Sequence, residues 1–137
     1  MNRARLTDSY FVAPQIEVED IKKIADAGFV KIICNRPDEE VPSNLSANVM
    51  KMAADTVGIE FEILPLTHFT MTPENIAKQF EIVAQANGPV LAYCASGTRC
   101  TIVWALSEVG KTEADDIIRV ARNAGYDLEA MRHALTK

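Results

Sequence analysis

The 137-residue sequence has little of several features on which other protein classes depend. Its three cysteines show no Cys-x2-Cys spacing, which disfavours a disulfide framework and a zinc site. Basic residues are outnumbered 14 to 19 by acidic ones, and the net charge of −5 argues against general binding to nucleic acid or anionic membranes. No apolar run approaches the ~20 residues that cross a bilayer, and the first residues lack a signal-peptide pattern. We therefore expect a cytoplasmic protein that recognises a small partner through a local site, without a metal or other cofactor.

Strand-like and helical patterns alternate along one domain, residues 1–137. The expected strands cover residues 10–12, 29–34, 59–64 and 90–93, which are short apolar or β-branched runs. The expected helices cover residues 18–27, 45–57, 73–86, 100–109 and 112–124, and Asp127 is expected to cap a last one. Strands separated by helices of this length predict a three-layer α/β fold: a mostly parallel central sheet with helices on both faces.

The segment after residues 90–93 carries most of the functional signal. The apolar run ends in Cys94, a loop of small residues follows, and Arg99 opens the next helical stretch. The loop consists of Ala95, Ser96, Gly97 and Thr98. Small residues let backbone N–H groups converge on one anion, and a helix N-terminus with a nearby arginine favours both a thiolate and a bound oxyanion. This order of strand, loop, arginine and helix favours an anion site over a cysteine that only fills the core.

Three segments together resemble the bacterial beta-lactamase-hydrolase-like domain, a branch of the tyrosine and dual-specificity phosphatase superfamily. They are Tyr-Phe-Val-Ala-Pro-Gln at 10–15, Ile-Ile-Cys-Asn-Arg-Pro at 32–37, and the run at 89–100 that contains Tyr-Cys-Ala-Ser-Gly-Thr-Arg-Cys. The resemblance spans essentially the whole chain. It implies a phosphatase-like fold, with Cys94 as nucleophile, Arg99 as anion clamp, and a phosphorylated or other small anionic molecule as substrate.

Two features depart from working phosphatases of that superfamily. Those enzymes have five residues between cysteine and arginine, whereas this chain has four, as in the active loop that rhodanese sulfurtransferases have. Phosphatases also place an aspartic acid to protonate the leaving oxygen, but no aspartate occurs between Asp55 and Asp115. His68 and Glu74 lie in the right region, and His68 is the candidate acid because Glu74 is explained as a first-turn helix residue.

Other residues near the motifs have more than one interpretation. Cys100 stands where a phosphatase has the hydroxyl that hydrogen-bonds the thiolate, so Thr101 or Ser96 is expected to take that role. Arg36 and its neighbour Asn35 follow a strand and either line the cleft or form an exposed loop pair. Arg36 is equally explained as a partner of the acidic residues at 38 and 39.

Three function classes remain open from the sequence. A thiolate phosphatase would attack phosphorus with Cys94, a sulfurtransferase would carry a persulfide on the same atom, and a binding module would only hold an anion. The resemblance places the phosphatase first, and the short loop with its missing acid keeps the sulfurtransferase close behind. Oligomeric state is left open.

The two remaining cysteines are candidate redox partners of Cys94. Cys34 ends the run at 29–34, which is expected to lie beside the strand of Cys94, with strand ends ~5 Å apart. Cys34 could therefore capture an oxidised Cys94 as a disulfide, and Cys100 is the rival partner. A buried strand residue without a redox role is the simpler interpretation of Cys34.

Overall fold

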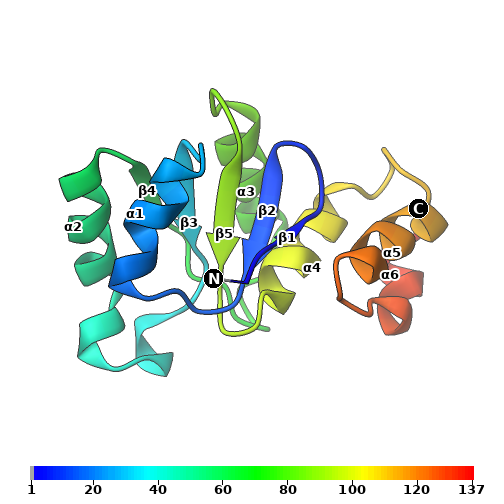
Figure 1. The fold of residues 1–137 in the computed structure, drawn as a ribbon. Helices are drawn as coiled ribbons and strands as arrows, with labels where there is room; N and C mark the ends of the chain where they lie inside the picture. Colours follow the sequence, from blue (N-terminus) through cyan, green and yellow to red (C-terminus); the bar gives the residue numbers. More distant parts are fainter. Residues whose placement is uncertain (1) are drawn as a thin grey trace.

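Five strands form one sheet in the order β1-β2-β5-β3-β4 in the computed structural model, which describes residues 2–137 (Figure 1). The strands are β1 (Ala4–Arg5), β2 (Tyr10–Ala13), β3 (Lys31–Cys34), β4 (Glu60–Ile63) and β5 (Val90–Tyr93). Strands β2, β5, β3 and β4 are parallel, and β1 pairs antiparallel with β2. The expected mostly parallel sheet is confirmed. The sequence did not reveal β1, because two residues are too few to show a period.

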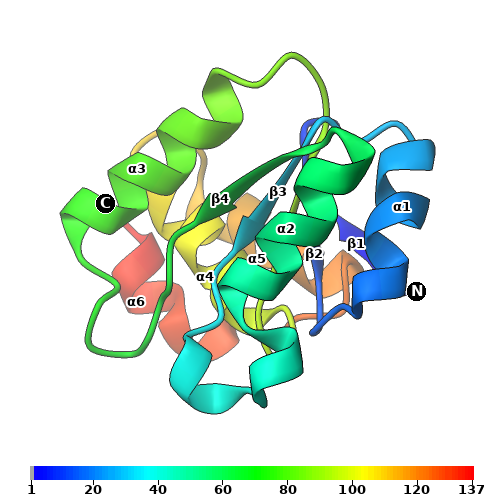
Figure 2. The ribbon, with the colours of Figure 1, turned by 90° about the vertical axis from the view of Figure 1, so that its left-hand side faces the viewer.

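Helices cover both faces of this sheet (Figures 1 and 2). The helices are α1 (Val18–Asp26), α2 (Ala47–Val57), α3 (Pro73–Ala84), α4 (Thr98–Ser107), α5 (Ala114–Asn123) and α6 (Arg132–Leu135). The first two pack together on one face, α3 packs with α4 on the other, and α5 and α6 lie outside α4. The three-layer α/β architecture is therefore confirmed.

Local chemistry explains where these helices begin. The Thr72 hydroxyl accepts from the backbone N–H of Asn75 at 3.2 Å, with proline at the first helical position, as expected. Helix α4 begins at Thr98, two residues before the expected start. The last helical stretch differs more, because the Asp127 carboxylate accepts from the Glu129 N–H ahead of a 3-10 turn, η3 (Glu129–Met131), and only then does α6 begin.

Alternation along β5 decides which way the site faces. Leu91 and Tyr93 belong to the core under α1 and α2, whereas Val90, Ala92 and Cys94 belong to the core under α3 and α4. Successive side chains of a strand point to opposite faces, so the period of two carries Cys94 toward α4. All of these residues are buried, as central parallel strands require.

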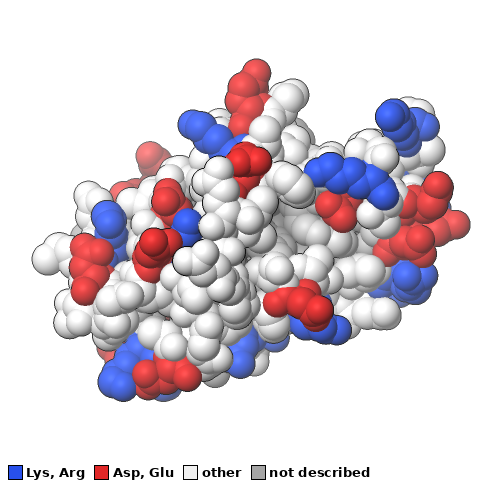
Figure 3. Space-filling view, turned by 90° about the horizontal axis from the view of Figure 1, so that it is seen from above, with Lys and Arg blue, Asp and Glu red and all other residues white. Residues whose placement is uncertain are grey.

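The surface carries charges of both signs. On the face seen from above, basic and acidic side chains are interspersed, and neither sign gathers into one patch (Figure 3). Within residues 2–137, the helices are all too short or too polar to cross a membrane.

Candidate active site

The carboxyl ends of three parallel strands meet around the segment that follows β5. The Cys94 N–H donates to the Ala13 carbonyl at 3.3 Å, and the Gln15 N–H donates to the Ala95 carbonyl at 3.2 Å. On the other side, the Asn35 N–H donates to the Tyr93 carbonyl at 2.9 Å. Ligands of parallel α/β sheets bind at this edge, so the fold places Cys94 where the sequence predicted a site.

The loop 95–98 is held in a tight turn by Gly97 and Tyr126. Gly97 has a φ of +94°, a left-handed conformation that glycine adopts without strain. A Cβ at this position would lie 2.1 Å from the Tyr126 hydroxyl, which donates to the Ser96 carbonyl at 3.0 Å. Ala95, Ser96 and Thr98 are exposed around this turn. No pattern in the sequence indicates that Tyr126 touches the loop, because the two are 30 residues apart.

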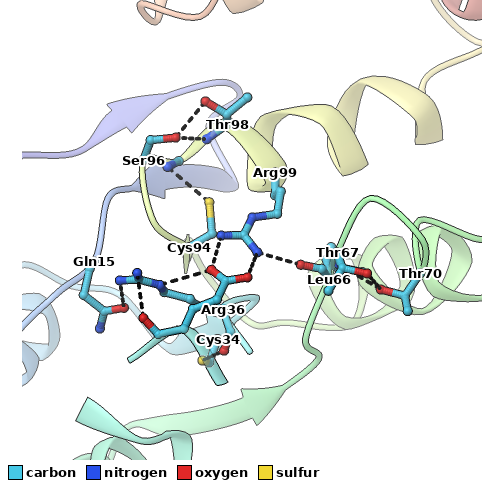
Figure 4. Close-up of polar contacts among 12 residues, drawn as sticks. Gln15, Cys34, Arg36, Leu66, Thr67, Thr70, Cys94, Ser96, Thr98 and Arg99 are labelled. Atoms are coloured by element: carbon cyan, nitrogen blue, oxygen red, sulfur yellow. Dashed lines mark hydrogen bonds and ion pairs between the residues drawn. The ribbon is translucent and has the colours of Figure 1, made fainter. Parts of the chain in front are cut away.

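The buried Cys94 sulfur accepts a hydrogen bond from the backbone of its own loop (Figure 4). The Gly97 nitrogen lies 3.1 Å from the sulfur and donates to it. Hydrogen bonding by the Cys100 thiol and by the backbone N–H groups of Cys100, Gly97 and Arg99 favours the ionised sulfur. Together they lower the pKa of Cys94 to about 5, with the Cys100 thiol contributing most, although burial acts in the opposite direction. Cys94 is therefore a thiolate at neutral pH, the form that attacks electrophiles.

Cys100 itself takes the position for which Thr101 or Ser96 was expected. The Thr101 hydroxyl donates to the Gly97 carbonyl at 2.8 Å, and the Ser96 hydroxyl pairs with that of Thr98 at 2.8 Å. Neither hydroxyl is directed at the sulfur. Burial raises the pKa of Cys100, so its thiol keeps the proton that it donates to Cys94.

Arg99 is fixed by a carboxylate that the sequence did not identify. Its Nη1 and Nη2 donate to the two carboxylate oxygens of Glu40 at 2.8 and 2.7 Å, and Nη1 also donates to the Leu66 carbonyl at 2.9 Å. These bonds lower the pKa of Glu40, which stays ionised and is a poor proton donor. No residue within 2–137 accepts from Nε of Arg99, so one edge of the guanidinium remains open to an oxyanion.

A second arginine supports this arrangement (Figure 4). Arg36 donates through Nε to the Glu40 carboxylate at 3.4 Å, through Nη2 to the Glu40 carbonyl at 3.1 Å, and through Nη1 to the Gln15 side chain at 3.2 Å. Its acidic partner is thus Glu40, where Asp38 or Glu39 was expected. The physical reason is that the Asp38 carboxylate already accepts from the Ala47 N–H at the start of α2, at 2.8 Å. Gln15 and Arg36 both belong to the segments that carried the family resemblance.

Asn35 does not line the cleft but lies in a buried polar network. Its side chain exchanges hydrogen bonds with that of Gln79 on α3, at 2.8 and 3.0 Å, and Gln79 donates to the Tyr10 hydroxyl at 3.2 Å. Tyr10 in turn donates to the Cys100 carbonyl at 2.7 Å. The network therefore ties β3, α3 and β2 to the first turn of α4, which holds Cys100 in place.

His68 lies in the loop after β4 and lines the same cavity as Arg99 and Glu40. The fold thus brings this predicted residue into a cavity that Arg99 also lines. Glu74 lies in the first turn of α3, as expected, and is not among the residues that line this cavity.

Cys34 lies on the neighbouring strand, but its side chain points away from Cys94. Cys34 pairs in register with Tyr93, so both side chains face the core under α1 and α2, whereas Cys94 faces α4. Its thiol donates to the Arg36 carbonyl at 3.4 Å (Figure 4). A Cys34–Cys94 disulfide stays a prediction that this arrangement disfavours, because opposed Cβ directions require backbone movement. Cys100, by contrast, belongs with Cys94 to the core under α3 and α4.

Comparison with known proteins identifies the family of this chain. The model of the phosphatase-like domain of beta-lactamase hydrolase-like proteins matches residues 3–111. The chain belongs to this family. The beta-lactamase hydrolase-like protein of Agrobacterium fabrum is 31% identical over 130 residues, which are 93% of this chain and 30% of that protein. The corresponding Xylella fastidiosa protein is 29% identical over 119 residues, 85% of this chain and 28% of its own length. The chain thus spans about 30% of the length of these relatives.

Solved structures agree with this assignment. A crystal structure of a Neisseria meningitidis protein, described as a phosphatase, is 34% identical, with a TM-score of 0.86 and coverage of 96% of this chain and 94% of that one. Pseudomonas aeruginosa TpbA in complex with phosphotyrosine is 13% identical, with a TM-score of 0.68 and coverage of 97% and 80%, a likeness of fold alone. The expected tyrosine and dual-specificity phosphatase-like fold is confirmed, and the chain is a phosphatase-like domain.

Proposed function

We propose that the protein hydrolyses phosphomonoesters with Cys94 as nucleophile. Its main support is the buried Cys94 sulfur, which accepts from the Gly97 N–H at 3.1 Å and whose pKa is lowered to about 5, beside an arginine with one open edge. The loop amides and Arg99 would hold the phosphoryl oxygens and stabilise the charge that develops on them. Family membership and the fold support phosphoryl chemistry as the reaction class.

The reaction would proceed in two displacements at phosphorus. The Cys94 thiolate attacks phosphorus, the bond to the leaving oxygen breaks, and a phosphocysteine forms. Water then attacks phosphorus and breaks the sulfur–phosphorus bond, releasing inorganic phosphate and regenerating the thiolate. Cys100 would act through Cys94, because its thiol stabilises the leaving thiolate in the second step.

His68 is the proposed proton donor to the leaving oxygen in the first step. It lines the cavity beside Arg99, whereas ionised Glu40 is a poor acid. The variant His68→Gln is expected to lose roughly 100-fold in kcat on alkyl phosphates, which need protonation, and little on aryl phosphates with acidic leaving groups. Equal losses on both substrate types would remove His68 from this role.

Sulfur transfer is the second candidate, and the four-residue loop between Cys94 and Arg99 favours it. In that reaction the thiolate would attack the outer sulfur of thiosulfate, release sulfite and pass the sulfane sulfur from the Cys94 persulfide to an acceptor thiol. No general acid is needed. Loop length is one observation, whereas the family and the whole fold support the phosphatase.

Parallel assays separate these candidates. Phosphomonoester hydrolysis and thiosulfate-to-thiol sulfur transfer are measured on the wild-type protein and on Cys94→Ser. We expect phosphate release that the substitution abolishes, with sulfur transfer at background. Cys94-dependent sulfur transfer without phosphate release would reverse the ranking, and anion binding without either reaction would make the domain a binding module.

A further inference from the structure

A cavity of about 680 Å³ is lined by Arg99, together with Glu40 and His68. Its walls are mainly apolar: Met71 comes from the loop after β4, Ile102 and Leu106 from α4, and Met131 and Ala134 from the C-terminal segment. Figure 2 shows the loop after β4 and α6 on the same side of the molecule. Ligand pockets for molecules of moderate size have volumes of about 300–1,000 Å³, so this cavity can hold more than a phosphoryl group.

The cavity and the anion site share one helix face. Arg99, Ile102 and Leu106 are three and four residues apart on α4, a spacing that places them on one side of the helix. Arg99 lines the cavity with its guanidinium near the Cys94 sulfur, which contributes to the raised pKa of the arginine. An oxyanion held by Arg99 would therefore have its ester substituent next to the apolar walls.

We propose that this cavity binds an aliphatic substituent of the substrate whose phosphoryl group lies in the Cys94 loop, an inference that rests on the proposed function. The preferred substrates are then monoesters of alkyl groups rather than of small polar alcohols. Flexible methionine and branched aliphatic side chains can pack around an alkyl chain. Within residues 2–137, no Phe, Tyr or Trp lines the cavity, so no aromatic side chain is there to stack on a ring of the ligand.

Binding measured apart from turnover tests this inference. Calorimetry on Cys94→Ser would compare inorganic phosphate, ethyl to octyl phosphate, and glycerol phosphate as a polar ester. We expect the Kd to fall about fourfold for each buried methylene until the cavity is filled, with glycerol phosphate no tighter than ethyl phosphate. A Kd independent of chain length, or no binding of any alkyl phosphate, would overturn the proposal.

A matched pair of variants locates the effect. Met71→Gln, combined with Cys94→Ser, should flatten the dependence on chain length and leave the Kd of inorganic phosphate unchanged. Met52→Gln makes the same change on α2, under the opposite face of the sheet, where the side chain is 70% exposed, and should leave every Kd unchanged. If both variants change the dependence of Kd on alkyl-chain length equally, the alkyl chain does not bind in the cavity.

Two further results distinguish this inference from the proposed function. If Cys94→Ser shows the chain-length dependence but the wild-type protein hydrolyses none of these esters, the apolar site stands and the phosphatase proposal fails. If all esters are hydrolysed with the same kcat/KM, the phosphatase proposal stands and the apolar site fails. Sedimentation that shows a wild-type dimer, lost in Met71→Gln, would mean that a second copy covers the cavity and would overturn the inference.

Discussion

At the scale of single residues, the site depends on two side chains that act through others. Hydrogen bonding by the Cys100 thiol lowers the pKa of Cys94, and Glu40 holds the Arg99 guanidinium. The sequence identified Cys94 and Arg99 from their local motif, but it assigned the supporting roles to Thr101 or Ser96 and placed no acidic residue on Arg99. The physical reason is that a motif records neighbours along the chain, whereas the Glu40–Arg99 pair joins residues 59 positions apart.

Substitution of Cys100 tests the origin of the low Cys94 pKa. Cys100→Ala removes the thiol donor and should raise the pKa of Cys94, whereas Cys100→Ser keeps a donor and should hold that pKa low. Thiolate absorbance in the ultraviolet, titrated with Cys94→Ser as the blank, measures this value. If Cys100→Ala titrates like the wild type, the thiol is not the main source of the shift.

Substitution of Glu40 tests how Arg99 is positioned. Glu40→Gln loses the paired charge, so the guanidinium is held less firmly, and kcat/KM should fall roughly tenfold. Glu39→Gln, a change at an exposed neighbour in the same short turn, is the control and should have no effect. A tighter Kd for phosphate in Glu40→Gln would show instead that the carboxylate competes with the anion.

At the scale of elements, the sequence predicted β2 to β5 and α1 to α5 to within two residues at each end. The run 90–93 matches β5, and the runs at 18–27 and 73–86 match α1 and α3 to within two residues. It did not reveal the 3-10 turn η1 (Asp38–Glu40), which carries Glu40, because a single turn leaves no hydrophobic period. The residue that fixes Arg99 was therefore hidden in a segment that looked like a polar loop.

The loop 95–98 should be sensitive to a side chain at Gly97. Gly97→Ala is expected to lower the free energy of unfolding by about 2–4 kcal/mol, from backbone strain and from the clash with Tyr126. Gly125→Ala is the control, since its φ of +101° brings similar strain with no atom within 4 Å of the new Cβ. Urea unfolding measures both, and equal losses would show that the Tyr126 contact is unimportant.

At the scale of the whole molecule, the fold positions the site through strand order and sheet polarity. Strand β5 lies between β2 and β3, so the ends of both neighbours border the Cys94 loop. Alternating strands and helices predicted this parallel arrangement. They did not predict that Cys34 and Cys94 face opposite sides of the sheet, because the paired register of β3 and β5 is fixed only in three dimensions.

The pH dependence of turnover follows from the Cys94 pKa. Because that pKa is lowered to about 5, the thiolate persists well below neutrality, and kcat/KM should fall only as pH drops through about 5. The pKa of Cys94 in the unfolded chain is ~8.5, so its lower pKa in the folded protein stabilises the fold. This stabilisation is fully present at pH above ~8.5 and is lost as the pH falls through about 5. If kcat/KM instead fell as the pH dropped through about 8, the lowered pKa assigned to Cys94 would be wrong.

We propose above that the Cys94 sulfur bonds covalently to phosphorus during turnover. Rapid acid quenching during phosphomonoester hydrolysis, followed by peptide mass spectrometry, measures this directly. We expect a phosphoryl group on Cys94 that forms in the burst phase. It should be absent in Cys94→Ser and absent from Cys34 and Cys100. Steady phosphate release without an adduct on Cys94 would contradict a covalent intermediate. Full activity in Cys94→Ser would contradict it as well.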